Sequence, residues 1–144
     1  MISDLLIGSM VGMLIMLIHL CSTVLVAKSV MILESWMRNS HWLFVVIAMM
    51  WMYILLGITL FICAGVWALV YYHLNLVDTL DEAFYSALVN YTTLGYGDLL
   101  QGTRTRLFGP IAAASGILMF SWAAAMLVYI LQAHLPHLIA RKKE

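Results

Sequence analysis

The segment TTLGYGD, residues 92–98, differs sharply from the rest of this chain. Two glycines, Gly95 and Gly97, lie one residue apart beside the carboxylate of Asp98, and long apolar runs lie on both sides. Glycines at this spacing disfavour a helix, and a carboxylate is unfavourable against lipid. The sequence therefore places a stretch of irregular backbone between two candidate membrane spans.

The composition is that of an integral membrane protein. Of 144 residues, 65% are hydrophobic and 10% are charged, and the mean hydropathy is +1.00, whereas a soluble domain has about 25% charged residues. The seven basic and seven acidic residues cancel, so nothing indicates a nucleic-acid partner. No long polar segment offers room for a soluble catalytic domain, and we expect no enzyme activity. The partner that the composition indicates is the lipid bilayer.

Three uncharged runs are long enough to cross a membrane, which takes about 20 helical residues. They cover residues 5–27, 42–72 and 107–133. The first run follows an acidic residue rather than a basic segment and has no convincing cleavage site, so we interpret it as a helix of the protein and not as a signal peptide. Between the first two runs, apolar and charged residues alternate over 28–41, which is typical of an interfacial amphipathic helix.

The basic residues predict how the chain is oriented. Lys28, Arg38 and the three basic residues at 141–143 fall on one side of the membrane, against Arg104 and Arg106 on the other. Because basic residues are in excess on the cytoplasmic side, we expect a multi-pass protein with its N-terminus outside and its C-terminus in the cytoplasm.

The segment between the second and third runs predicts a helix that does not span. Thr79 is followed three residues later by Glu82, a capping-box pattern, and Asp78 and Asp81 add negative charge at the helix N-terminus. The apolar stretch that follows ends near Tyr91, which makes a helix of roughly 20 Å. A helix this short with an acidic start must enter the membrane and return on the same side.

The return path is the glycine-containing segment. Non-helical backbone at membrane depth is tolerated only where protein buries it or where it lines a watery cavity. Gly95 and Gly97 tolerate left-handed dihedrals, which let successive carbonyls point one way while the side chains of Leu94 and Tyr96 point the other. The sequence thus predicts a row of oxygens that needs a polar guest.

Residues 92–98 resemble the selectivity filter of potassium channels, written T-x-G-Y-G-D. The one departure is Leu94, where Val or Ile is more common. The surroundings fit as well, because a reentrant helix precedes the motif and a span lies on either side. The resemblance covers residue 42 to about 133, and the first span has no counterpart in the minimal two-span pore.

The resemblance implies the ion chemistry. Carbonyl oxygens of Thr93, Leu94, Gly95 and Tyr96, with the Thr93 hydroxyl, would replace the hydration shell of K⁺, and Gly97 completes the filter. Because the chain has one such motif and no repeat of it, four copies are needed, most simply as a homotetramer. K⁺ is then the permeant ligand, and no cofactor is expected.

The implied fold is an all-α membrane protein with three transmembrane helices, a reentrant pore helix and a filter loop, assembled as a tetrameric channel. We divide the chain into an N-terminal helix with its interfacial linker (1–41), a pore domain (42–135) and a short cytoplasmic tail (136–144).

The resemblance also assigns residues that support the filter. Thr92 leads into it, Tyr96 packs into the surrounding cuff, and Asp98 lies at the outer mouth, where the pore-helix residue Tyr85 would donate a hydrogen bond to it. Some relatives carry an acidic residue where this chain has Val89. We therefore expect fewer hydrogen bonds to Asp98 and altered inactivation.

The third run resembles the pore-lining inner helix. The small residues from Ala112 to Gly116 permit close approach to the pore helix. Gly116 has two interpretations, a gating hinge or a site of tight packing. Phe120 and Ala124, four and eight residues further on, are candidates to line the central cavity.

Several alternatives stay open. The chain is a potassium channel, a nonselective cation channel, or a silent or regulatory subunit of a larger channel. Its five histidines are better explained by hydrogen bonding than by a metal or haem site, and Gly8 and Gly12 form a weak helix-contact motif. No span carries arginines at three-residue spacing, so no voltage sensor is indicated. The small size favours a prokaryotic inner membrane.

Overall fold

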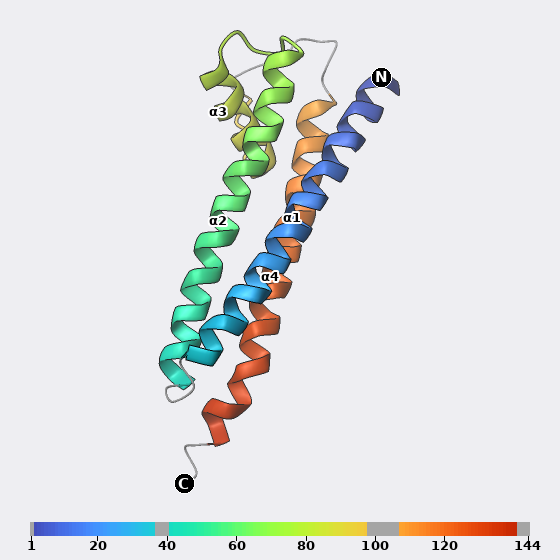
Figure 1. The fold of residues 1–144 in the computed structure, drawn as a ribbon. Coiled ribbons are helices and arrows are strands. Elements are labelled where there is room, and N and C mark those ends of the chain that lie inside the picture. The colour runs from blue at the N-terminus through green and yellow to red at the C-terminus, as the bar shows by residue number, and fades with distance from the viewer. Residues whose placement is uncertain (1, 37–40, 98–106, 141–144) are drawn as a thin grey trace.

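The structure is a computed structural model that describes residues 2–36, 41–97 and 107–140. Within these ranges the chain forms helices α1 (Ile2–Trp36), α2 (His41–His73), α3 (Leu80–Tyr91) and α4 (Phe108–Ala140). Figure 1 shows α1, α2 and α4 as long rods that run alongside one another, with the short α3 beside one end of α2. The N-terminus lies at the same end as α3, and the C-terminus lies at the opposite end.

Three of the helices are long and apolar enough to span a membrane. The candidate spans are Ile2–Leu33, Leu43–His73 and Phe108–Gln132, and the described residues contain no strand. The predicted all-α membrane architecture with three spans and one short helix is therefore confirmed. The chain is an integral membrane protein.

Two helix ends differ from the sequence-based boundaries. The separate interfacial helix predicted within 28–41 is not seen, because α1 continues without a break to Trp36. No glycine or proline lies between residues 27 and 36 to end the helix, and Val30 is buried in the core that α1 shares with α2 and α4. At the other end of the chain, α4 extends to Ala140, into the interval predicted to be a tail. Residues 37–40 and 141–144 lie outside the described residues.

The helices pack around two apolar clusters. The cluster near α3 contains large buried side chains, among them Trp67, Tyr71, Tyr91 and Phe108. The cluster at the opposite end contains side chains from α1, α2 and α4, such as Val26, Phe44 and Ile130. Helix α3 contributes only to the first cluster, so its packing is confined to that end of the bundle.

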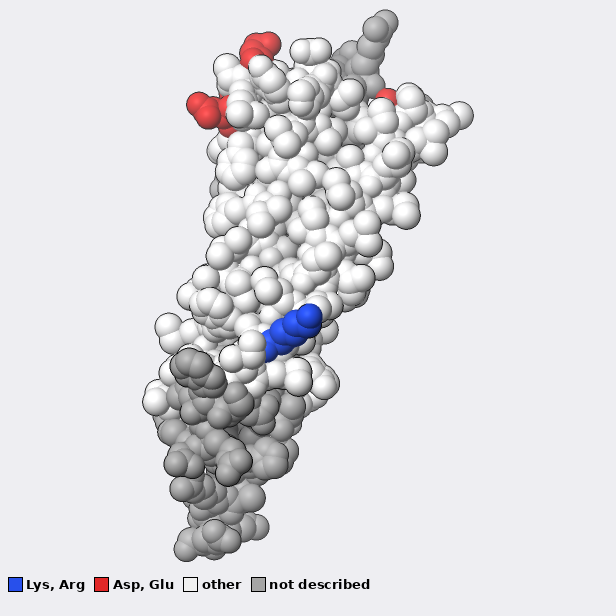
Figure 2. All heavy atoms as spheres, viewed as in Figure 1, with Lys and Arg blue, Asp and Glu red and all other residues white. Residues whose placement is uncertain are grey.

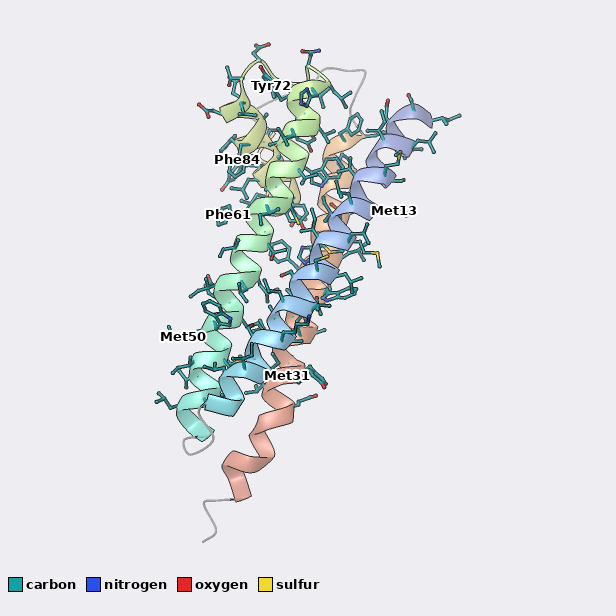
Figure 3. All side chains as sticks on the ribbon, viewed as in Figure 1. Met13, Met31, Met50, Phe61, Tyr72 and Phe84 are labelled. Carbon is teal, nitrogen blue, oxygen red and sulfur yellow. The ribbon has the colours of Figure 1, made fainter. Side chains whose placement is uncertain are left out.

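Most of the apolar surface faces outward. Only 17% of the most apolar window of α1, and 22% of those of α2 and α4, is buried within the chain. Met13, Met31 and Met50 point away from the bundle (Figure 3) and are more than half exposed. Such surfaces are suited to contact with lipid or with further copies of the chain.

The described acidic and basic side chains lie in opposite halves of the bundle. Figure 2 shows the acidic groups at the end that carries α3 and the N-terminus, while the basic group lies in the opposite half. The described acidic side chains include Asp78, Asp81 and Glu82 beside the start of α3, and the described basic one is Lys28 near the end of α1. Between them, the described residues 5–27, 43–72 and 108–132 carry no charged side chain, which suits a hydrocarbon core.

Candidate ion-conducting site

The short helix α3 begins with the capping box that the sequence predicts. The Thr79 hydroxyl accepts a hydrogen bond from the Glu82 backbone N–H at 3.2 Å, and the Thr79 backbone N–H donates to the Glu82 carboxylate at 3.3 Å. Two otherwise unpaired N–H groups are satisfied in this way. The acidic side chains of Asp81 and Glu82 lie in the first turn, where the helix dipole favours negative charge.

The other end of α3 closes with a Schellman motif. The Thr93 N–H donates to the Asn90 carbonyl at 3.0 Å, and the Leu94 N–H donates to the Val89 carbonyl at 3.0 Å. These are the two bonds of that motif, with Thr92 as the C-cap. The Gly95 N–H also donates to the Val89 carbonyl, at 3.3 Å. The last turn of α3 therefore holds the first residues of the TTLGYGD segment directly.

Thr93 occupies the position of this motif where glycine is usual. Its φ is +63°, a left-handed conformation that is strained for a β-branched residue. Strain of this kind, of about 1–3 kcal/mol, persists only where the surroundings impose it, and it concentrates at functional sites. The sequence predicted left-handed backbone at the two glycines, and Thr93 was not foreseen.

Left-handed backbone recurs at every second residue of the segment. Gly95 has φ +57° and Gly97 has φ +70°, as the sequence predicts, and the intervening Leu94 and Tyr96 are not left-handed. Alternating the sign of φ turns successive peptide groups the same way, so N–H groups gather on one side and carbonyls on the other. From Thr93 to Gly97 the sign of φ therefore alternates from one residue to the next.

The side chains between the left-handed residues point into open space. Leu94 is 59% exposed and Tyr96 is 68% exposed, so residues 2–36, 41–97 and 107–140 supply no cuff around Tyr96. Thr92 is different, because its hydroxyl donates to the Leu88 carbonyl at 2.7 Å and stays with the helix.

Asp98 lies outside the described residues, so its predicted bond with Tyr85 stays a prediction. Val89 is buried next to the segment that it anchors.

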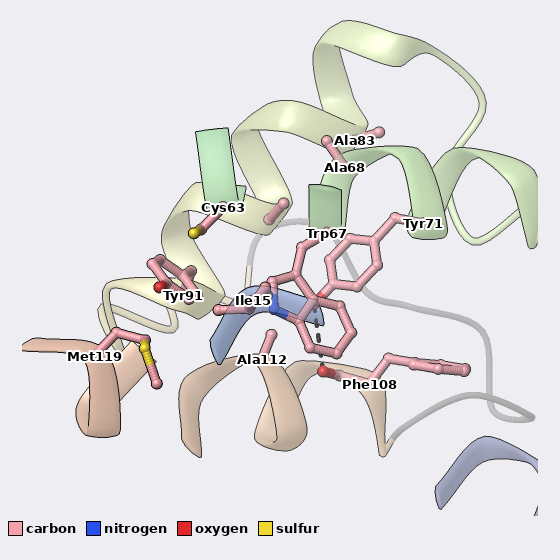
Figure 4. Close-up of a cluster of buried hydrophobic side chains, with 11 residues drawn as sticks. Ile15, Cys63, Trp67, Ala68, Tyr71, Ala83, Tyr91, Phe108, Ala112 and Met119 are labelled. Atoms are coloured by element: carbon pink, nitrogen blue, oxygen red, sulfur yellow. Dashed lines mark hydrogen bonds between the residues drawn. The ribbon is translucent and has the colours of Figure 1, made fainter. Parts of the chain in front are cut away.

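Hydrogen bonds among aromatic and polar side chains fix α3 between α2 and α4. The Asn90 amide of α3 donates to the Tyr71 hydroxyl at 3.2 Å, and that hydroxyl donates to the Phe108 carbonyl at 3.4 Å. The Trp67 indole N–H donates to the Ser115 hydroxyl at 3.1 Å. Figure 4 shows Trp67 and Tyr71 packed between α2 and the start of α4. Helix α3 is therefore held to α2 by a directional bond as well as by apolar packing, and α2 is bonded in turn to α4.

The predicted close approach of the third span to the reentrant helix occurs at Gly116. A Cβ atom at this position would overlap the carbonyl oxygen of Tyr91 and lie 2.9 Å from its carbonyl carbon. No other described glycine is covered by backbone in this way. Tight packing at Gly116 is confirmed, whereas its role as a gating hinge stays a prediction. A Cβ at Gly8 would meet the side chain of Ile111, whereas a Cβ at Gly12 would meet nothing within 4 Å. Only half of that motif therefore forms a contact.

A pocket of about 560 Å³ lies beside the end of α3, with its walls formed by all four helices. His19, Phe61, Tyr91 and Phe120 are among its lining residues, and the wall is mostly apolar. Phe120 packs against Tyr91 with ring centroids 6.4 Å apart. Ala124 is exposed and is not part of this wall. The pocket lies within one chain, so the roles of Phe120 and Ala124 in a central cavity between copies stay predictions.

His19 contacts the end of α3, a contact that the sequence did not indicate. His19 of α1 is 5% exposed, and its Nε2 lies 3.3 Å from the Tyr91 hydroxyl. The sequence indicated hydrogen bonding for the histidines but gave no partner, because the two residues are 72 positions apart. The described residues contain no group of three or more His, Cys, Asp or Glu side chains arranged to hold a metal. Cys21 and Cys63 form no disulfide.

Comparison with known proteins identifies the segment built around this site. A family model described as "Ion channel" matches residues 59–133, which is just over half of the chain. The match covers the second half of α2, all of α3, the TTLGYGD segment and most of α4, and it leaves α1 outside. No curated protein and no solved structure matches the chain. The resemblance to channel pores is confirmed at the level of the family, and this protein belongs to that family of ion channels.

Proposed function

We propose that this chain forms a potassium-selective channel, in which four identical copies surround one axis and each contributes one strand of the filter. K⁺ crosses passively, coordinated by the carbonyl oxygens of Thr93, Leu94, Gly95 and Tyr96 and by the Thr93 hydroxyl. The observation that carries the proposal is the alternation of left-handed backbone at Thr93, Gly95 and Gly97 directly after the Schellman end of α3.

Coordination of K⁺ by backbone carbonyl oxygens needs no charged side chain. Each carbonyl carries a partial negative charge, and several carbonyls around one site offset the loss of water from a monovalent cation. The C-terminal end of α3 adds the negative end of a helix dipole near the same place. A single strand provides one quarter of each cage, so the exposed side chains of Leu94 and Tyr96 are free to be covered by neighbouring copies.

The same proposal includes the bilayer as a partner and the orientation of the protein in it. The acidic start of α3 lies at the end of the bundle that carries the N-terminus, while Lys28 lies in the other half. With basic residues favoured on the cytoplasmic side, the filter mouth and the N-terminus face outward and the C-terminus is cytoplasmic. The proposed location is a prokaryotic inner membrane.

Ion flux into liposomes that contain only the purified chain tests the proposal. The parent protein should pass K⁺ and exclude Na⁺. Gly95→Ala should reduce selective flux because alanine is strained at φ +57°, and Thr93→Ala should reduce it because one ligand oxygen is lost. Equal passage of both ions by the parent would favour a nonselective cation channel. Absence of flux under every condition would favour a regulatory subunit.

A further inference from the structure

Helix α1 is bonded to each of the other three helices through polar side chains on one face. His19, Ser22 and Thr23 are spaced i, i+3 and i+4, so they lie on the same side of the helix. His19 Nε2 lies 3.3 Å from the Tyr91 hydroxyl of α3, the Ser22 hydroxyl lies 2.7 Å from that of Thr59 on α2, and the Trp122 indole N–H of α4 donates to the Thr23 hydroxyl at 3.0 Å.

These bonds lie inside an apolar span. The residues sit in the middle of the candidate span Ile2–Leu33, where lipid provides no hydrogen-bond partner for a polar side chain. Bonds between helices in a membrane contribute about 0.6 kcal/mol on average and up to about 1.7 kcal/mol. Helix α1 is therefore attached to the channel segment at defined points, although it lies outside the residues that match the ion channel family.

The bond from His19 reaches the residue that ends the reentrant helix. Tyr91 is the last residue of α3, and Thr92 and Thr93 follow it immediately. Its side chain is 1% exposed, Cys63 of α2 belongs to the same buried cluster, and its carbonyl lies against Gly116. The side chain and the backbone of Tyr91 are thus both fixed, the side chain by α1 and α2 and the backbone by α4.

We propose that His19 is a positioning residue for the filter: by holding the Tyr91 hydroxyl it fixes the end of α3 from which Thr92 and Thr93 lead into the ion path. This inference rests on the proposed potassium selectivity. It makes α1 part of the selectivity machinery of this chain, although the minimal two-span pore has no such helix.

The chain contains a matched control for this role. Ser22 lies one turn from His19 on the same face and forms the same kind of interhelical bond, but its partner is Thr59 on α2 rather than a residue of α3. Removing either bond weakens the attachment of α1. Only the loss of the His19 bond should change the position of the end of α3. The K⁺/Na⁺ ratio therefore distinguishes a specific effect on the filter from a general weakening of the attachment of α1.

The experiment measures the K⁺/Na⁺ flux ratio of the full chain in liposomes. His19→Leu and Tyr91→Phe should each lower the ratio about threefold, the factor that corresponds to one interhelical hydrogen bond of about 0.6 kcal/mol. His19→Gln should restore the ratio, because its amide can still bond to the tyrosine hydroxyl. Ser22→Ala should leave the ratio at the parental value.

The outcomes separate the two proposals. A selective parent whose ratio is unchanged in His19→Leu and Tyr91→Phe overturns the role of His19 alone, and so does a loss in Ser22→Ala equal to that in His19→Leu. A parent that does not discriminate K⁺ from Na⁺ overturns the proposed function and this inference with it. If His19→Leu does not assemble, Tyr91→Phe decides, since it removes one hydroxyl from the same pair and keeps the ring.

Discussion

Replacing Gly116 by alanine should destabilise the chain by about 2 kcal/mol. The added Cβ would overlap the Tyr91 carbonyl, and overpacking costs about 1–3 kcal/mol. The upper end of that range applies because the blocking atoms belong to the backbone at the end of a helix and cannot rotate away. Alanine regains about 1 kcal/mol of helix propensity relative to glycine, which leaves the net loss of about 2 kcal/mol.

Unfolding by a denaturing detergent in mixed micelles measures this loss. The matched control is Gly57→Ala, because Gly57 lies inside α2 and a Cβ there meets nothing within 4 Å. The free energy of unfolding should fall for Gly116→Ala and stay level or rise for Gly57→Ala. If both variants are as stable as the parent, the close contact between α4 and the end of α3 does not exist as described.

Three further substitutions test the ends and supports of the reentrant helix. Thr79→Ala removes the capping side chain and should lower the free energy of unfolding in mixed micelles by about 0.5–2 kcal/mol; an unchanged value would mean that the capping box does not contribute. Thr93→Gly should raise that free energy by about 1–2 kcal/mol because the left-handed strain is relieved, while K⁺ flux into liposomes falls because the hydroxyl ligand is lost; full flux would exclude the hydroxyl as a ligand. Trp67→Phe removes the donor to Ser115 and should destabilise the same unfolding transition by about 1 kcal/mol, and no loss would argue against that bond.

The sequence predicts those features that depend on short-range chemistry. The capping box at Thr79 and Glu82 places the start of α3 at the residue where the structure has it, because both partners lie within one turn. The left-handed backbone at Gly95 and Gly97 follows from the absence of a Cβ atom. The three spans follow from apolar runs whose length is set by the thickness of the membrane.

Features that depend on packing could not be read from the sequence. Threonine carries no signal for a left-handed conformation, so the strain at Thr93 appears only when the hydrogen bonds that end α3 are known. The partner of His19 depends on how α1 lies against α3, which periodicity alone does not determine. The alternation of apolar and charged residues over 28–41 indicates a separate element, whereas α1 continues to Trp36 because nothing there breaks the helix.

The number of chains in the purified particle decides whether the proposed ion cage can close. A single strand cannot enclose an ion, so the proposed ion cage needs four copies of the 16.2 kDa chain. Native mass spectrometry of the particle in detergent measures this number. Four copies per particle are expected, and a particle with only one or two copies would leave the proposed cage open.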